Sequence, residues 1–239
     1  MQSPKIILLA LFFFASSCAS AQINKLLKDV TSGQMSLSQD EVAAGLKEAL
    51  EQGIVKGTDL ASKTDGYFKN DLIKILLPED AQKVEKTLRQ MGLGGEVDRA
   101  LLAINRGAER AAVEAKPIFV NAIKQMNIQD ALAILKGEPT AATDFLKRTT
   151  NAQLVELFKP KIQASLDEVG ATKYYGDLAS TYNKIPLTRQ KIDPDLNAYV
   201  TQKAIDGLFV LIAEEEKNIR ENPLGRTTDL MKKVFAQQD

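Results

Sequence analysis

The sequence predicts an all-α fold, a single compact domain of about nine or ten helices around a buried C-terminal helix. Apolar residues recur at helical spacing along most of the chain, whereas the strict alternation of a half-buried strand is rare. The stretch Leu208–Ala213 is apolar on every side, as expected for a helix enclosed by others. The composition, 44% hydrophobic and 26% charged, is that of an ordinary globular protein and excludes a disordered or fibrous chain.

Residues 1–21 have the features of a secretory signal peptide. Lys5 supplies a positive charge, Ile6–Phe14 is an apolar run of nine residues, and small residues follow from Ala15 to Ala21. Nine residues extend about 14 Å as a helix, far less than the hydrocarbon core of a bilayer, which is about 30 Å thick. We therefore expect a signal peptide over 1–21, an N-terminal lead-in over 22–37 and an all-helical domain over 38–239, with no transmembrane span in the mature chain.

Two processing routes fit this segment. Ala19 and Ala21 satisfy the small-x-small rule for cleavage, which would leave Gln22 as the mature N-terminus of a periplasmic or secreted protein. Alternatively, Ala15–Cys18 is similar to a bacterial lipobox, and cleavage there would leave an acylated Cys18 and a membrane-tethered lipoprotein. The first route is preferred because Ala15 stands where a lipobox usually has a larger aliphatic residue. That route also removes the only cysteine, which suits an oxidising compartment.

The first helical segment is expected to begin at Ser38, because Ser38 and Glu41 have the spacing of a capping box. Gly53 has the character of a helix end. A short helix over 59–63 and a turn at Asp65-Gly66 follow. Tyr67–Pro78 is expected to be a packed irregular or extended segment, because the residue before a proline favours an extended backbone.

The middle of the chain predicts a helical hairpin, with helices over 79–91 and 96–115 separated by the turn Gly92–Gly95. A helix over 118–126 comes next, and the spacing of Asn127 and Asp130 then introduces a short helix that ends near Gly137.

The last part of the chain predicts a helix over 140–148 and another from Thr150 to Gly170, with a kink or a break at Pro160. A shorter helix is expected over 175–183. Asp193 is expected to cap the apolar C-terminal helix, with Pro194 as its first residue. Glu214–Glu216 is interpreted as the solvated end of that helix, and a final helix spans 227–236.

Several classes of chemistry are excluded by composition. The chain has no histidine and one cysteine, which removes Ser-His-Asp and Cys-His nucleophiles, histidine-dependent zinc sites and disulfide frameworks. No cofactor or metal is expected; in particular, Asp193-x-Asp195-x-Asn197 lacks the later glycine and glutamate of a calcium loop. Acidic and basic residues balance at 31 each and no basic run exceeds two residues, so nucleic acid is not expected as a partner.

Charged residues inside apolar helical faces are the candidate site. Arg106, Glu109 and Arg110 lie on an alanine-rich helix, and Lys203 and Asp206 share a face of the most apolar one. The preferred interpretation is salt bridging at the edge of the core, because lone buried charges are costly. The alternative is a cleft that binds a small polar or anionic ligand through these five residues.

Long strings of the sequence resemble a known family. They include Asp195–Ala204, Lys116–Phe119 and Ala141–Phe145. Together they resemble the bacterial domain-of-unknown-function family 4197 over nearly the whole mature chain. The resemblance implies an exported helical domain of bacteria and no catalytic residue.

The sequence thus favours a non-enzymatic module of the cell envelope, whose partner is a small molecule or an envelope protein. Two alternatives stay open: a histidine-independent envelope enzyme that uses carboxylate and Lys or Arg groups, and a lipidated outer-membrane accessory protein.

Overall fold

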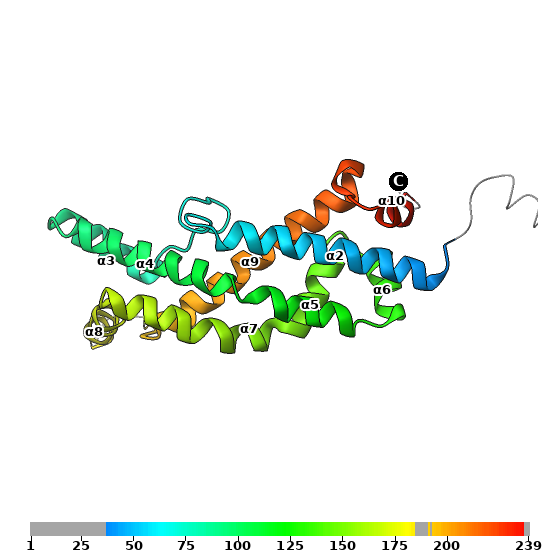
Figure 1. Ribbon diagram of the computed structural model, residues 1–239. Helices are drawn as coiled ribbons and strands as arrows, with labels where there is room; N and C mark the ends of the chain where they lie inside the picture. Colours follow the sequence, from blue (N-terminus) through cyan, green and yellow to red (C-terminus); the bar gives the residue numbers. More distant parts are fainter. Residues whose placement is uncertain (1–36, 185–190, 192, 237–239) are drawn as a thin grey trace, which may run out of the picture. The chain divides into compact units, whose positions relative to one another are not determined.

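The computed structural model describes residues 37–184, 191 and 193–236, and these residues form helices and connecting turns without a strand (Figure 1). The α-helices are α2 (Gln39–Ser62), α3 (Glu79–Gln90), α4 (Gly94–Ala112), α5 (Ala115–Gln125), α6 (Ile128–Leu135), α7 (Ala141–Glu168), α8 (Ala171–Asn183), α9 (Leu196–Glu221) and α10 (Asp229–Phe235). A 3-10 turn, η1 (Pro223–Gly225), precedes α10. Ser38–Asp239 forms one compact unit. The predicted all-α class is confirmed, while the predicted signal peptide and Cys18 lie outside the described residues.

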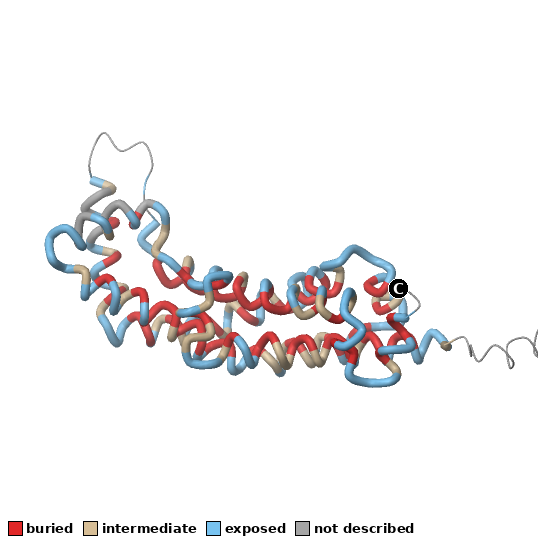
Figure 2. Tube along the Cα trace, turned by 90° about the horizontal axis from the view of Figure 1, so that it is seen from above, coloured by how far each residue is buried: buried red, intermediate tan, exposed pale blue. Residues whose placement is uncertain are grey.

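The bundle has four main rows, namely α2, α4 followed by α5, α7, and α9 (Figure 1). Helix α9 packs against both α2 and α7, and α4 and α5 also pack against α2 and α7. Helices α7 and α9 are antiparallel, because Asn197 near the start of α9 bonds to Gln163 whereas Glu216 near its end bonds to Ala142. The buried residues lie mostly along the stretches where the helices run beside one another (Figure 2).

The predicted central helix is α9. Leu208, Phe209, Leu211 and Ile212 are buried, and burial of each such side chain contributes about 1.5–3 kcal/mol. The expectation that this stretch is enclosed on every side is wrong at Val210, which is 40% exposed. Helix α9 therefore has one narrow face in solvent.

Small residues at intervals of four allow α2 to approach its neighbours closely. The residues in this row are Gly45, Ala49, Gly53, Gly57 and Ala61. A Cβ atom at Gly57 would lie 3.3 Å from Ile212 Cγ1, and one at Gly45 would lie 2.6 Å from Val234 Cγ2. The predicted helix end at Gly53 is wrong, because the helix continues to Ser62 and its glycines serve close packing.

Helix α7 is continuous, whereas the sequence suggested two helices divided near Thr150. The hydroxyl of Thr150 donates to the carbonyl oxygen of Leu146 at 2.7 Å, one turn earlier, and so does not cap a new helix. Pro160 lies inside α7, which continues to Glu168.

The capping predictions are confirmed at two helices and corrected at a third. Ser38 and Glu41 form a capping box at α2, and Asn127 and Asp130 form one at α6. At α9 the cap is Asp195, whose carboxylate accepts from Ala198 N at 2.9 Å, rather than Asp193. Asp193 instead accepts from Asp195 N and shapes the turn before the helix.

Candidate functional site

The α4 residues Arg106 and Glu109 hold the turn that follows α2. Glu109 is only 4% exposed, and its Oε1 accepts from the backbone N–H groups of Tyr67 and Phe68 at 3.1 and 3.2 Å. Its other oxygen pairs with Arg106, whose Nη2 also lies 2.6 Å from Asp65 Oδ1. The expected salt bridging at the edge of the core is present here as the pair Arg106–Glu109, and Glu109 also satisfies backbone donors that would otherwise be buried alone.

Hydrogen bonds between charged side chains shift the pKa values of two residues in this cluster. Hydrogen bonds from Lys69 and Arg106 hold the pKa of Asp65 below its ordinary value, and the hydrogen bond to Glu109 raises the pKa of Arg106. Both shifts favour the charged forms of Asp65 and Arg106.

Two further polar residues, which the sequence did not single out, secure the segment 67–78. Asn105 accepts from Ile75 N and donates to Ile75 O, each at 2.9 Å. The buried phenol of Tyr67 donates to Ala204 O on α9 at 2.6 Å, and burial raises the pKa of this phenol. The irregular segment is consequently tied to α4 and α9 by named hydrogen bonds, in agreement with the packed irregular segment expected there.

The remaining predicted site residues lie at other places on the bundle. Arg110 forms an exposed ion pair with Glu168, with N–O distances of 2.9 and 3.1 Å. On the outward face of α9, Lys203 lies 5.8 Å from the ring centre of Tyr199, and Asp206 accepts from Gln202 at 2.9 Å. Among the contacts of the described residues, none joins Lys203 or Asp206 to the α4 cluster.

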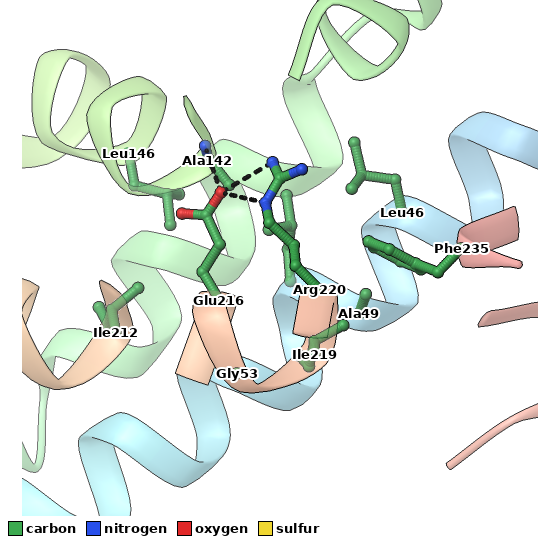
Figure 3. A pocket seen from close by; sticks show the side chains of 11 residues that line it. Leu46, Ala49, Gly53, Ala142, Leu146, Ile212, Glu216, Ile219, Arg220 and Phe235 are labelled. Carbon is green, nitrogen blue, oxygen red and sulfur yellow. Dashed lines mark hydrogen bonds and ion pairs between the residues drawn. The ribbon is translucent and has the colours of Figure 1, made fainter. Parts of the chain in front are cut away.

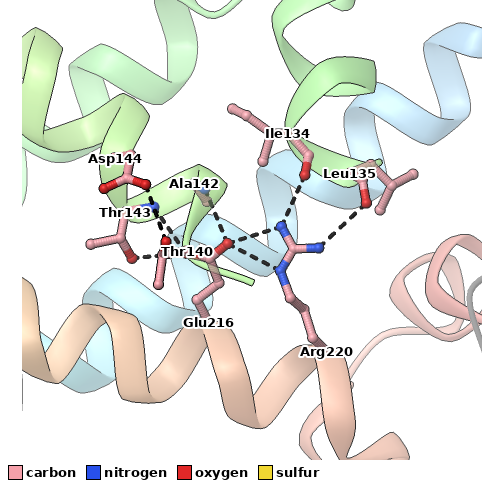
Figure 4. A network of polar contacts seen from close by, with 8 residues as sticks. All are labelled: Ile134, Leu135, Thr140, Ala142, Thr143, Asp144, Glu216 and Arg220. Carbon is pink, nitrogen blue, oxygen red and sulfur yellow. Dashed lines mark hydrogen bonds and ion pairs between the residues drawn. The ribbon is translucent and has the colours of Figure 1, made fainter. Parts of the chain in front are cut away.

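A buried pair missed by the sequence analysis joins three helices (Figure 4). Glu216 accepts from the backbone N–H groups of Ala142 and Thr143 in the first turn of α7, at 3.0 and 2.9 Å. Arg220 pairs with Glu216 at 2.9 Å and donates to the carbonyl oxygens of Ile134 and Leu135 at the end of α6. Each charge thus faces the helix end of opposite partial charge. The interpretation of Glu214–Glu216 as a solvated helix end is wrong for Glu216, which is buried.

The space beside this pair is small (Figure 3). It measures about 20 Å³, room for about one water molecule, and apolar side chains of α2, α7 and α9 line most of it. This space is therefore too small for an organic ligand. The role of Glu216 and Arg220 is to connect the helices of the bundle.

A larger groove of about 220 Å³ lies between α5, α6 and α7. Its lining residues are Ile118, Asn121, Ala122, Gln125, Asp130, Phe145, Thr149, Thr150 and Gln153. They combine apolar side chains with amide, hydroxyl and carboxylate groups, which is the composition of sites that orient small polar molecules. We call this feature the α5–α7 groove.

Most polar atoms of the α5–α7 groove keep hydrogen-bonding capacity. Asp130 accepts from Asn127 N with Oδ2 only, and Gln125 Nε2 donates to Asn121 Oδ1, so Asp130 Oδ1, Gln125 Oε1 and Asn121 Nδ2 stay available. Gln153 makes no hydrogen bond to any described residue. Both ends of its amide are therefore free to meet a ligand.

The part of the chain that the structure describes contains no group of three or more acidic or cysteine side chains placed to hold a metal ion. None of the described helices combines the length and apolar character needed to cross a bilayer.

Comparison with known proteins gives one match. The family described as "Protein of unknown function (DUF4197)" matches residues 36–236. No curated protein and no solved structure matches the chain. Because the match spans nearly all of the helical unit, the chain belongs to the DUF4197 family.

Proposed function

We propose that this chain is an exported, non-enzymatic module of the bacterial cell envelope that binds a small polar molecule in the α5–α7 groove. The observation that carries the proposal is the set of uncommitted polar atoms around that groove. By contrast, the carboxylates of Glu109 and Glu216, which are buried in the bundle, are engaged with backbone N–H groups. A polar concavity with free donors and acceptors is the feature that a ligand would complete.

Three carboxyl groups have shifted pKa values, and none of the three shifts is in the direction that a general acid needs. A general acid that works at neutral pH needs a carboxyl group with a raised pKa. Glu41, Asp65 and Glu168 all have lowered pKa values, because hydrogen bonds from Ser38, Lys69 and Arg110, respectively, stabilise the carboxylates. These groups are therefore built to stay ionised.

Export is supported by the positive charge and short apolar run that precede Ala21. The location proposed is the periplasm or the extracellular space, with tethering through Cys18 as the alternative.

Thermal denaturation with a set of small polar probes tests the binding proposal. The probes are sugars, amino acids, polyamines and dicarboxylates. A ligand at 100 times its Kd stabilises the folded state by about 2.7 kcal/mol, so at least one probe should raise the Tm of the unmodified chain. The Gln153→Ala variant should lose that rise.

Gln90→Ala is the matched control. It removes an exposed glutamine from α3, a helix that does not line the α5–α7 groove. The proposal is overturned if no probe raises the Tm, or if active probes raise it equally in both variants.

A further inference from the structure

The hydrogen-bonding atoms of the α5–α7 groove are mostly acceptors. The hydroxyls of Thr149 and Thr150 already donate to the carbonyl oxygens of Phe145 and Leu146, at 2.9 and 2.7 Å, so their oxygens can only accept from a ligand. Asp130 Oδ1, Gln125 Oε1 and Gln153 Oε1 are acceptors too. The free donors are the amide groups of Asn121 and Gln153 and the second hydrogen of the Gln125 amide. A ligand that fits must bring several donors and a few acceptors.

The charge of the groove opposes an anion. Its lining includes one carboxylate, that of Asp130, and no basic side chain. The guanidinium of Arg148 lies 5.6 Å from the ring centre of Phe145, but Arg148 is not among the lining residues. A carboxylate or phosphate group placed in the groove would lose hydration and meet a like charge, at a cost that no lining cation offsets.

An ammonium group would satisfy only the acceptors of the groove. The side-chain amides of Asn121, Gln125 and Gln153 also have free N–H groups, and an ammonium group offers them no acceptor. The lining therefore suits hydroxyl groups, each of which donates one hydrogen bond and accepts others.

The lining also has apolar side chains. Phe145, Ile118 and Ala122 add carbon atoms to it. A sugar ring presents hydroxyls at its edge and C–H groups on its faces, so it can satisfy both kinds of lining. A volume of about 220 Å³ is below the range of about 300–1,000 Å³ that drug-sized ligands occupy, which limits the fit to about one ring.

We infer that the α5–α7 groove seats one ring of a neutral saccharide, with hydroxyls bonded to Asp130 and Gln153 and a ring face against Phe145. This inference rests on the proposed binding function and names the chemical class of its ligand.

Nuclear magnetic resonance titration of the full chain with three matched sugars tests the inference. Glucose, glucosamine and glucuronate share one ring and differ in charge. Glucose should shift the amide resonances of residues 145–153, and glucuronate should bind at least about tenfold more weakly because of its charge. Gln153→Ala should weaken glucose binding about tenfold, whereas Gln90→Ala should leave it unchanged.

The Asp130→Asn variant separates charge from shape. It removes the negative charge and keeps an acceptor oxygen, so the preference for glucose over glucuronate should shrink toward equal affinity. Asp144→Asn, an exposed change in the first turn of α7, should leave the preference intact.

The outcomes also separate this inference from the proposed function. If glucuronate or glucosamine binds at least as tightly as glucose, or if only non-sugar probes shift residues 145–153, the assignment to a neutral saccharide is wrong and the binding module stands. If neither the sugars nor the other probes shift these residues, both are wrong.

Discussion

Glu216 and Arg220 show how single buried charges hold helices together in this bundle. Replacing Glu216 by Gln puts an amide where two backbone N–H groups and the Thr143 hydroxyl need acceptors, and leaves Arg220 without its counter-charge. Breaking one partner of a buried pair costs about 3–5 kcal/mol. We expect Glu216→Gln to lower the free energy of unfolding by that order, measured by urea denaturation.

Glu168→Gln is the comparison for this prediction. It breaks the ion pair with Arg110, which lies in solvent, and solvent-exposed pairs add little stability. If Glu168→Gln lowers the free energy of unfolding as much as Glu216→Gln does, burial does not explain the contribution of the Glu216–Arg220 pair.

Asp65 links stability to pH. Its pKa in the folded protein lies below the ordinary value of 3.8, so the folded state favours the ionised form more than the unfolded state does. The resulting stabilisation is present above pH 4 and is lost as the pH falls through the lower, folded-state pKa. Asp65→Asn should make the fall in stability below about pH 4 shallower, and asparagine tolerates the positive φ of 68° at this position.

Asp206→Asn is the charge-matched control for acid denaturation. Asp206 lies on the outward face of α9 and accepts a hydrogen bond from the uncharged Gln202. An acid transition unchanged by Asp65→Asn, or changed equally by both variants, would show that the Asp65 cluster contributes nothing to the pH dependence.

At the residue scale, sequence predicts local pairings and misses distant ones. The capping boxes at Ser38 and Asn127 and the pair Arg106–Glu109 span three residues, so spacing alone reveals them. Glu109 and Glu216 reach backbone groups 42 and 74 residues away, and no pattern within one helix encodes such a partner.

At the scale of elements, the glycines of α2 carry the most testable claim. A valine at Gly57 would meet Ile212, whose Cγ1 already lies 3.3 Å from where a Cβ would be, so α2 and α9 would have to separate. Overpacking of this kind costs about 1–3 kcal/mol. In a domain of this size, Gly57→Val should lower the Tm by about 2–4 °C for each kcal/mol lost.

Gly176→Val makes the same change on α8, where a Cβ would meet nothing within 4 Å. Its Tm should change much less than that of Gly57→Val. Equal losses at the two positions would mean that valine acts through helix propensity rather than through the contact of α2 with α9.

Two predicted helix boundaries, at Gly53 and Thr150, are wrong. Both residue types are common at helix ends, yet both residues lie inside helices. Gly53 lets α9 pack closely against α2, because a Cβ atom placed at Gly53 would lie 3.6 Å from Glu215 Cβ. The hydroxyl of Thr150 donates to a carbonyl oxygen of its own helix. At Gly53, close packing of α2 against α9 outweighs the low helix propensity of glycine.

At the scale of the whole molecule, the proposed export makes a prediction about the mature N-terminus. Mass spectrometry of the chain expressed in a bacterium and purified from whole cells with detergent should show Gln22 as the first residue. A species that begins at an acylated Cys18 would replace this account with the tethered lipoprotein, and an unprocessed Met1 would contradict export.

The α5–α7 groove itself was beyond sequence-based prediction. Its lining comes from three segments, namely 118–125, Asp130 and 145–153, and their polar residues are ordinary surface residues in the sequence. Only the placement of α5 beside α7 brings them together. The charged residues that did stand out, such as Arg106 and Glu109, are those that stabilise the fold.

Crystal structures of the full chain, soaked separately with glucose and with a mixture of small polar probes, test the central claim most directly. The account predicts electron density for a bound molecule between Phe145 and Gln153, within hydrogen-bonding distance of Asp130. Molecules bound only at other places on the bundle, with the α5–α7 groove empty in every soak, would contradict it.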